Sequence, residues 1–441
     1  MAKINTKPET IKTHEGASVQ HINPELQLRR SVMACMLWEA TFYESGESIS
    51  DRIVKLIPLI SPVKVAALAV EAREKMKLRH VPLLLVREMA RLETHKRLVA
   101  ETLARIIQRP DEITEFVALY WKDKRQPLSA QIKRGLSAAF NKFNEYQFAK
   151  YDRKGKIKLR DVLFLSHAAP KNEEQAILFA KLVARELTIP DTWEVALSTG
   201  KDKKETWERL ITENKLGGLA FLRNLRNMQE VGVDVAIIKQ GLEVLKSQRI
   251  LPFRFISAAK YAPQLEPDIE KAMLKCLEGK EKLPGKTVLL VDGSGSMFGV
   301  PVSKKSEIDC FEAGAALAIL LYEICEECQI FVFSNLAKLV PSRKGFALRD
   351  VLYKYAGRAG TYTQRALDTV NECGEYDRLI LITDEQSHQT ISPPTGNAKG
   401  YIVNVATYQN GIGYGAWTHI DGFSENIMDY IIEAEKELME N

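Results

Sequence analysis

Five oxygen-bearing residues stand where three segments of the chain can bring them together. Asp292, Ser294 and Ser296 form a D-x-S-x-S arrangement directly after an apolar run. Asp384 follows a second apolar run, and Thr361 precedes a helical stretch. Two carboxylates and three hydroxyls are hard oxygen donors, which suit Mg²⁺, or Mn²⁺ in its place, and do not suit zinc. The sequence therefore predicts a divalent-cation site, and the alternative is an ordinary loop between a strand and a helix.

A second group of residues is cationic. Residues 150–160 hold six Lys and Arg around one glycine, with one acid, Asp152, among them, and His167 follows. Ammonium and guanidinium groups at this density favour phosphate oxygens, and a histidine can add a hydrogen bond or stack on a base. For a single lysine the alternative is a solvated surface, and for His167 it is a buried histidine that closes a helix. The cations are Lys150, Arg153, Lys154, Lys156, Lys158 and Arg160.

Two further pairs of arginines are spaced for a common helix face. Arg87 and Arg91 are four residues apart, and Arg223 and Arg226 are three apart. We interpret both pairs as candidate RNA contacts. A protein that holds mainly phosphates should bind RNA less tightly as salt rises. The same interpretation extends to Lys77, Arg79 and His80, and to Asn224 and Asn227, which could bond bases or cap helix turns.

The elements that carry these residues differ along the chain. From Pro24 to about Leu277 the apolar residues recur at helical spacing, as in residues 81–108 and 207–229, and prolines and glycines interrupt them. So many successive helices without a strand favour a solenoid of helix pairs over a single bundle. We expect a flexible polar tail over residues 1–24 and a helical repeat domain over residues 25–280.

After Pro284 the pattern changes to short apolar runs rich in β-branched residues. Runs at 287–292, 329–334, 378–384 and 401–406 alternate with amphipathic helical stretches. This alternation predicts an α/β, doubly wound and mostly parallel sheet over residues 286–441. Ligands bind at the carboxyl ends of such strands, which is where the five oxygen donors stand.

Composition narrows the class of protein. The net charge of +5 divides unevenly, because residues 281–441 carry 14 basic against 22 acidic residues and residues 1–280 carry 48 against 35. A basic helical part favours a polyanionic partner. No apolar run is long enough to span a membrane, the polar start lacks a signal-peptide core, and six cysteines are too few for a disulfide scaffold. These features predict a cytoplasmic protein without a membrane partner.

The last part of the chain resembles a von Willebrand factor A domain, whose sheet is Rossmann-like, with its metal-ion-dependent adhesion site. The resemblance lies in Asp292-Gly293-Ser294-Gly295-Ser296, in Thr361 and in Asp384. It implies that Ser294, Ser296 and Thr361 are direct ligands and that the two aspartates act mainly through water. It also implies one coordination position left open for an acidic group of a partner. Glu385 departs from the pattern, since a small residue is usual there; it could shift the metal preference or point away.

The helical part resembles the TROVE domain of the Ro autoantigen family. The strongest segments are RDVLFLSHAAP (160–170), LRNLRNM (222–228) and LPFRFISAAKY (251–261), which occur in the family's order. The resemblance implies a HEAT-like repeat ring closed by the A domain. It implies that small Y-type RNA binds the outer surface at Lys150, Lys154 and His167, and that single-stranded 3′ ends of misfolded RNA enter the central hole. An exoribonuclease such as polynucleotide phosphorylase is a further partner that it implies.

These observations favour a nonenzymatic RNA-binding protein in RNA quality control or processing. The alternative is a metal-dependent protein-interaction scaffold without RNA. A hydrolase is disfavoured because Ser294 lacks a nucleophile elbow and a His-Asp pair. Cys325 and Cys328 lack a second pair of ligands for zinc and stand at a helix end, so we interpret them as ordinary thiols.

Overall fold

The computed structural model describes residues 12–18, 23–34, 46–152, 155–198, 202–247, 250–299, 301–302, 307–406, 411–422 and 425–440. The chain divides into two compact units. One is residues 50–216, and the other joins residues 1–49 to residues 217–441. Within the described residues, every helix is too short or too polar to cross a lipid bilayer.

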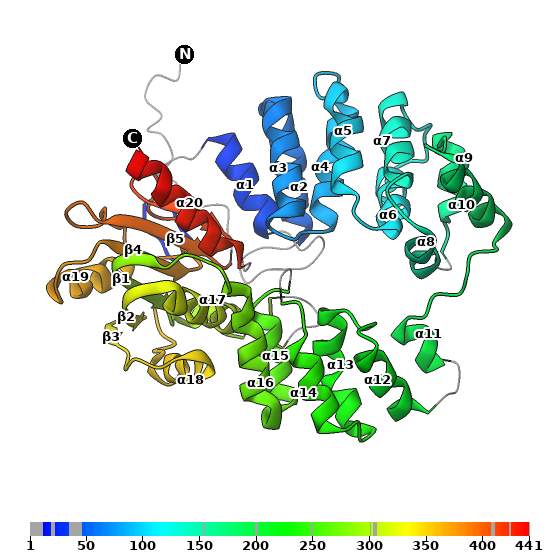
Figure 1. The fold of residues 1–441 in the computed structure, drawn as a ribbon. Helices are drawn as coiled ribbons and strands as arrows, with labels where there is room; N and C mark the ends of the chain where they lie inside the picture. Colours follow the sequence, from blue (N-terminus) through cyan, green and yellow to red (C-terminus); the bar gives the residue numbers. More distant parts are fainter. Residues whose placement is uncertain are drawn as a thin grey trace, which may run out of the picture. The chain divides into compact units, whose positions relative to one another are not determined.

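The unit of residues 50–216 is helical throughout its described part (Figure 1). Prolines or polar caps start several of its helices: Pro62 and Pro110 occupy first turns, and Ser129, Asn144 and Asn172 accept from the third backbone N–H that follows. The elements are α2 (Gly46–Leu56), η1 (Ile57–Leu59), α3 (Pro62–Glu74), α4 (His80–Arg91), α5 (Lys96–Ile106), α6 (Pro110–Tyr120), α7 (Ala130–Phe140), α8 (Glu145–Tyr151), α9 (Leu159–Ser166), α10 (Glu173–Ala184), α11 (Trp193–Ser198) and α12 (Lys203–Thr212).

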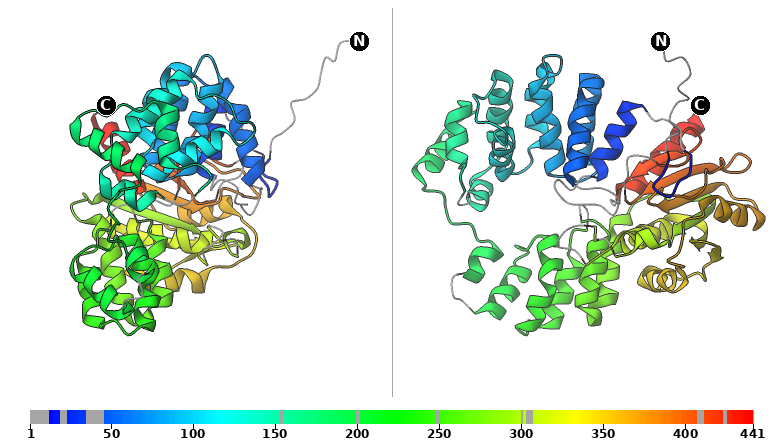
Figure 2. Two further views of the ribbon diagram at one scale, coloured as in Figure 1. Left: turned by 90° about the vertical axis from the view of Figure 1, so that its right-hand side faces the viewer. Right: turned by 180° about the vertical axis from the view of Figure 1, so that it is seen from behind.

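These helices form two layers. Helices α3, α5, α7 and α9 contact one another in sequence, and α4, α6 and α8 do the same. Helices of one layer also pack on those of the other, which buries a continuous apolar core between them. The solenoid of helix pairs predicted from the sequence is therefore confirmed, and it is HEAT-like (Figures 1 and 2).

Close packing within a layer depends on a small residue. Gly135 in α7 lies against α5, where an added Cβ would be 2.9 Å from the Ala100 carbonyl oxygen and 3.0 Å from Leu103 Cβ. The helical stretch of residues 81–108 is interrupted at Leu92, whose backbone is extended, so it forms α4 and α5. His95 follows the break, and its buried ring bonds the Ile60 carbonyl at 3.1 Å.

The second unit joins the first helix of the chain to a shorter helical series and to the sheet. Helices α13 and α15 are in contact, as are α14 and α16, so the layered pattern recurs here (Figure 2). Helix α15 also contacts α17 of the sheet region. The elements up to the sheet are α1 (Pro24–Ala34), α13 (Gly218–Glu230), α14 (Val235–Glu243), α15 (Phe253–Tyr261), η2 (Pro263–Leu265), α16 (Glu266–Leu274) and η3 (Lys275–Leu277).

Six strands form one sheet in the order β3-β2-β1-β4-β5-β6, and every neighbouring pair is parallel except β2 with β3. The four predicted strands are confirmed, and β3 and β6 are additions at the two edges. The elements are β1 (Leu283–Asp292), η4 (Gly295–Met297), α17 (Cys310–Ile324), β2 (Cys325–Phe333), β3 (Ala337–Leu339), α18 (Gly345–Tyr355), α19 (Thr363–Glu372), β4 (Arg378–Thr383), β5 (Lys399–Asn404), β6 (Thr418–Asp421) and α20 (Asn426–Glu440).

Helices cover both faces of the sheet, as a doubly wound fold requires. Leu290 and Leu381 belong to one core cluster, together with Leu367 of α19. Ile382 points to the other face, where its side chain meets Gly314 of α17. The carboxyl ends of β1 and β4 are neighbours in this sheet, so the residues that follow them must meet at one edge.

Candidate metal centre and nucleic-acid interface

The residues after β1 and β4 form an oxygen cluster, which we define as Asp292, Ser294, Ser296, Thr361 and Asp384. The Ser296 hydroxyl donates to Asp384 Oδ2 at 2.5 Å, and the hydroxyl oxygens of Ser294 and Ser296 lie 3.3 Å apart. Asp292 is held from both sides, since its Oδ1 accepts from the Ser294 amide at 2.9 Å and its Oδ2 from the Thr383 hydroxyl at 2.6 Å. The structure thus brings four of these residues together by direct contacts.

Thr361 reaches the same edge through its loop. The Gly295 amide donates to the Ala359 carbonyl at 2.8 Å, and the Arg358 amide donates to the Gly293 carbonyl at 2.8 Å. These bonds tie the loop before α19 to the loop after β1. From the other side, the His388 amide donates to the Thr361 carbonyl at 2.9 Å. Thr361 itself is buried between the two loops that hold the aspartates.

The electrostatics of the oxygen cluster fit a cation. Asp292 and Asp384 are both fully buried. Burial, together with the negative charge of Asp384, raises the pKa of Asp292 to about 7. Two buried carboxylates near each other repel each other unless a positive charge lies between them. No group of three or more His, Cys, Asp or Glu side chains suited to a metal occurs among the described residues, so any ion here would depend on hydroxyl ligands and water, as Mg²⁺ does.

Glu385 points away from the oxygen cluster. Its backbone is left-handed, with φ of 60°, and its buried carboxylate pairs with the Arg30 guanidinium of α1 and with His419 Nδ1 at 2.8 Å. Arg30 also contacts the Tyr414 hydroxyl, and the Tyr414 ring stacks on His419. The Arg30 charge offsets the effect of burial and lowers the pKa of Glu385. The structure therefore supports the interpretation in which Glu385 points away from the metal site, and not the one in which it shifts the metal preference.

The cationic cluster of residues 150–167 spans α8, α9 and the turn between them. Arg153 and Lys154 lie outside the described residues. Lys150 is in the last turn of α8, where its ammonium is 6.0 Å from the centre of the Tyr146 ring. Lys156 is exposed in the turn, and the amide of Lys158 donates to Asp161 Oδ2 at 3.1 Å, which starts α9. Cations and an exposed aromatic ring therefore occur together on this segment.

His167 ends α9. Its φ of 51° is left-handed, which is uncommon outside glycine, and its amide bonds the last turn of the helix. The residue does close a helix, as one interpretation had it, but its side chain is exposed and not buried. A non-glycine residue that is held in this conformation and has an exposed side chain is a candidate for a binding role.

A hollow of about 660 Å³ adjoins His167 in the same helix layer. Alanines of α5 and α7 form much of its wall, and Lys133 and Arg134 of α7 line it as well. Neither cation makes an ion pair within the described part of the chain, although Glu101 stands at the same hollow. We use the name RNA face for the candidate RNA contacts Lys133, Arg134, Lys150, Lys156 and His167. Of these, Lys133, Arg134 and His167 line the hollow. Sequence reasoning missed Lys133 and Arg134 because two adjacent cations make no dense cluster.

Arg87 and Arg91 are already engaged in ion pairs. Arg87 is only 6% exposed and donates to Asp123 Oδ2 at 2.5 Å, with Glu88 at 3.0 Å. Arg91 donates to the same Asp123 oxygen at 2.7 Å. An RNA phosphate at this place would have to compete with Asp123. The spacing of the two arginines was visible in the sequence, but the carboxylate that joins them comes from more than 30 residues away.

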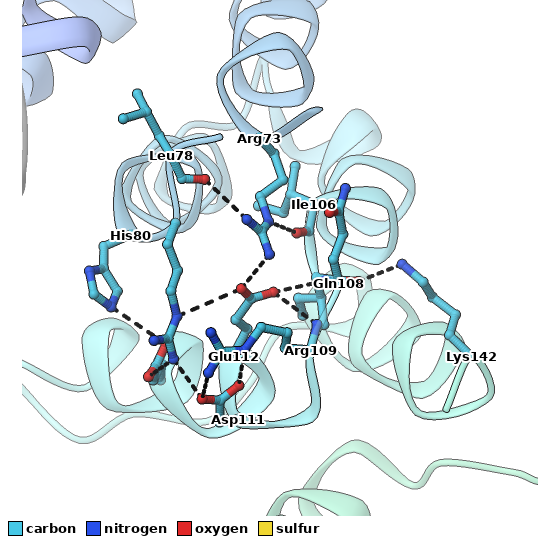
Figure 3. Close-up of polar contacts among 12 residues, drawn as sticks. Arg73, Leu78, His80, Ile106, Gln108, Arg109, Asp111, Glu112 and Lys142 are labelled. Carbon is cyan, nitrogen blue, oxygen red and sulfur yellow. Dashed lines mark hydrogen bonds and ion pairs between the residues drawn. The ribbon is translucent and has the colours of Figure 1, made fainter. Parts of the chain in front are cut away.

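Arg79 and His80 belong to a second ionic network around buried Glu112 (Figure 3). Glu112 accepts from Arg73 at 2.5 Å and from the amides of Gln108 and Arg109 at 2.8 and 3.1 Å. Figure 3 shows Glu112 at the centre of these contacts, which join α3 to the start of α6. Arg79 donates to Asp111 at 2.7 Å, and His80 lies 3.6 Å from Glu115. These cations hold helices together.

On α13, Arg223 and Arg226 are both exposed, and Arg226 donates to Glu230 at 2.8 Å. Arg223 has no carboxylate partner among the described residues. Burial, together with the charge of Arg223, lowers the pKa of Arg254 on α15. Two guanidiniums near each other without an acid favour an anion between them. The side chain of Asn224 is internal, donating to the Ala220 carbonyl at 2.8 Å, and Asn227 donates to Asn224 at 2.9 Å.

The fold and these sites define a class of protein: a layered helical repeat array joined to an A-type α/β domain, with cationic helix faces and an oxygen-lined sheet edge. The comparisons with known proteins agree with this class. Residues 184–288 match the family model of the TROVE domain. In structure the chain is similar to the Ro (RSR) protein of Deinococcus radiodurans, with a TM-score of 0.57, 15% identity, and coverage of 94% of this chain and 100% of that one.

Curated relatives match a short part of the chain. Telomerase protein component 1 of Mus musculus is 37% identical over 86 residues, and that of Rattus norvegicus is 36% identical over 86 residues. Each match covers 18% of this chain and 3% of the relative, so the chain spans a small part of those proteins. Residues 184–288 are therefore similar to the TROVE domain, and the fold of the chain is similar to that of a Ro protein.

Proposed function

We propose that the protein binds a small structured noncoding RNA of the Y type on the RNA face. In this proposal the protein is not an enzyme and acts in the cytoplasm, in RNA quality control or processing. Single-stranded 3′ ends of misfolded RNA enter the central hole that the family resemblance implies, and an exoribonuclease such as polynucleotide phosphorylase receives them. The observation that carries the proposal is the hollow beside exposed His167, which holds two cations without a carboxylate partner among the described residues.

The chemistry of the RNA face suits RNA more than protein. Lys133 and Arg134 can bind phosphate oxygens, and the alanine wall and the His167 ring can pack against an unstacked base. Lys150 and Lys156 add positive charge at the end of α8 and in the turn that follows. Because such contacts release counterions, we expect the affinity to fall steeply as salt rises.

Filter binding of a structured RNA and of a 3′-tailed RNA at two salt concentrations tests this proposal. Replacing Lys150, Lys154 and His167 together with alanine should weaken binding of the structured RNA at least about tenfold, since each charge-assisted contact contributes about 1.5–3 kcal/mol. Lys133→Ala/Arg134→Ala should weaken it to a similar degree.

The control is Lys338→Ala/Lys354→Ala, which removes two exposed cations from the sheet domain. It should leave RNA binding unchanged. If the control weakens binding as much as the other variants, the RNA face is wrongly placed. If the parent binds neither RNA at low salt, the proposed function is wrong and the protein-interaction scaffold becomes the better interpretation.

We further propose that the oxygen cluster binds Mg²⁺, or Mn²⁺ in its place. Ser294, Ser296 and Thr361 would be direct ligands, and Asp292 and Asp384 would act mainly through water, following the family pattern. The burial of both carboxylates, and the repulsion by which Asp384 helps to raise the pKa of Asp292, support this proposal. When bound, the ion would offer an open position to an acidic group of a partner, which is the docking chemistry that the scaffold interpretation requires.

A further inference from the structure

The loop after β4 has two neighbours. Its first residue, Asp384, belongs to the oxygen cluster, and the residues that follow contact the N-terminal part of the chain. Asp384 accepts from Ser296 at 2.5 Å and from the Gln386 amide at 3.0 Å. The next residues of this loop contact residues 12–18, which we call the strap. Residues 1–49 and the sheet domain belong to the same compact unit, so these contacts lie within one unit.

Three hydrogen bonds fasten the strap to the loop. The His14 amide donates to Gln386 Oε1 at 2.7 Å, and the Thr13 hydroxyl donates to the Ser387 carbonyl at 2.7 Å. Further along, the Thr390 hydroxyl donates to the Ser18 carbonyl at 3.1 Å. The contacts join residues that are more than 370 positions apart in the chain.

The strap has a defined internal structure. Lys12 and Ser18 pair as an antiparallel bridge, and the Thr13 amide donates to the Ala17 carbonyl at 2.9 Å. The Ala17 amide in turn donates to the Thr13 hydroxyl at 3.0 Å. Thr13 is buried, so the same hydroxyl closes the strap on itself and bonds the loop. In the docked state, these internal bonds hold the strap as a closed turn.

A second line of contacts runs from the strap to Thr361, a candidate metal ligand. Glu15 Oε2 lies 3.1 Å from His388 Nε2. The amide of His388 donates to the Thr361 carbonyl at 2.9 Å, and its ring Nδ1 lies 3.3 Å from the Thr361 amide. The strap thus supports both loops that carry candidate ligands on this side of the oxygen cluster.

We propose that the divalent cation and the strap bind these two loops cooperatively, each raising the affinity of the other. This inference rests on the proposed metal site. Both ligands order the same irregular backbone, which includes Glu385 in a left-handed conformation that a non-glycine residue adopts only at a cost. Once one ligand has ordered the loops, the second binds without repeating that cost, and thermodynamic linkage makes the effect reciprocal.

Binding of Mn²⁺ to the full chain, measured from the loss of the electron paramagnetic resonance signal of the free ion, tests the coupling. Thr13→Val removes the hydroxyl that bonds both the loop and the strap, and Glu15→Gln removes the charge that faces His388. Each variant should bind Mn²⁺ about fivefold more weakly, the effect of one hydrogen bond. The control is Ser18→Ala, which leaves the carbonyl acceptor of Thr390 in place and should bind Mn²⁺ as the parent does.

The reciprocal measurement is amide hydrogen exchange of residues 13–18 with and without Mg²⁺. The amides of His14 and Ala17 should exchange more slowly when Mg²⁺ is present. Equal Mn²⁺ affinities for parent, Thr13→Val and Glu15→Gln, with unchanged exchange, would overturn the coupling and leave the metal site standing. A parent that binds no Mn²⁺ would overturn the metal proposal and the coupling with it.

Discussion

Asp292 is a residue whose protonation should report on the proposed metal site. Its raised pKa means that, without a cation, the folded chain binds a proton near neutral pH that the unfolded chain has released. This proton stabilises the folded state only at pH values below the pKa that Asp292 has in the folded chain. The metal-free protein should therefore lose stability as pH rises from about 4 toward neutrality. A bound cation would offset this loss of stability, because its charge compensates the ionised carboxylate of Asp292.

We therefore expect Mg²⁺ to raise the midpoint of thermal unfolding more at pH 8 than at pH 5. Differential scanning calorimetry at the two values, with Mg²⁺ or with a chelator, measures the difference. Asp292→Asn should abolish the pH dependence of the Mg²⁺ effect. An equal shift at both pH values in the parent would contradict the proposed electrostatics of the oxygen cluster.

The residues of the oxygen cluster could be predicted because their signal is local. Asp292, Ser294 and Ser296 form one short motif at the end of a buried strand, and Asp384 follows another buried strand. The pairing of Arg87 with Asp123 and of Glu385 with Arg30 could not be predicted in this way. Those contacts depend on the folded arrangement of distant segments, and every arginine in a sequence looks equally available.

At the scale of elements, the contact between α5 and α7 depends on Gly135. Replacing it with alanine improves helix propensity by about 1 kcal/mol, but the new Cβ would stand 2.9 Å from a backbone oxygen that cannot move alone. Overpacking of this kind costs about 1–3 kcal/mol, so steric conflict should win. We expect Gly135→Ala to lower the midpoint of urea denaturation.

Ser137→Ala on the same helix serves as the control and should leave the midpoint nearly unchanged. Because the hollow lies between these two helices, Gly135→Ala should also weaken RNA binding if the RNA face is correctly placed. A variant that is as stable as the parent would show that α5 and α7 can separate without loss.

The elements themselves followed from the sequence more closely than their contacts did. Periodicity of three and four indicated the helices, and β-branched runs indicated four strands. The sequence pattern did not reveal the break at Leu92, because the apolar spacing of α4 continues into α5 almost in phase. It also missed β3 and β6, since edge strands are short and only partly buried.

At the scale of the whole molecule, the buried pair of Arg30 and Glu385 joins the first helix to the sheet. Arg30 is 2% exposed, and Glu385 is fully buried. Removing one partner leaves an unpaired buried charge, so Arg30→Met should destabilise the protein by about 3–5 kcal/mol, and Arg30→Met/Glu385→Met by less.

The matched control is Arg226→Met. Its ion pair with Glu230 has side chains that are 65% and 55% exposed, and such surface pairs contribute about 0–1 kcal/mol. Chemical denaturation of the three variants measures the differences. Equal losses for Arg30→Met and Arg226→Met would mean that water reaches the Arg30 site.

The same pair sets an order of events during synthesis. Arg30 is made 355 residues before its partner Glu385, which at about 5–20 residues per second corresponds to roughly 20–70 s on the ribosome. The helical layers between them can pack while translation continues, since their contacts are mostly between neighbouring helices. The contact of α1 with the sheet through Arg30 can therefore form only after residue 385 has been synthesised, when nearly all of the chain has been made.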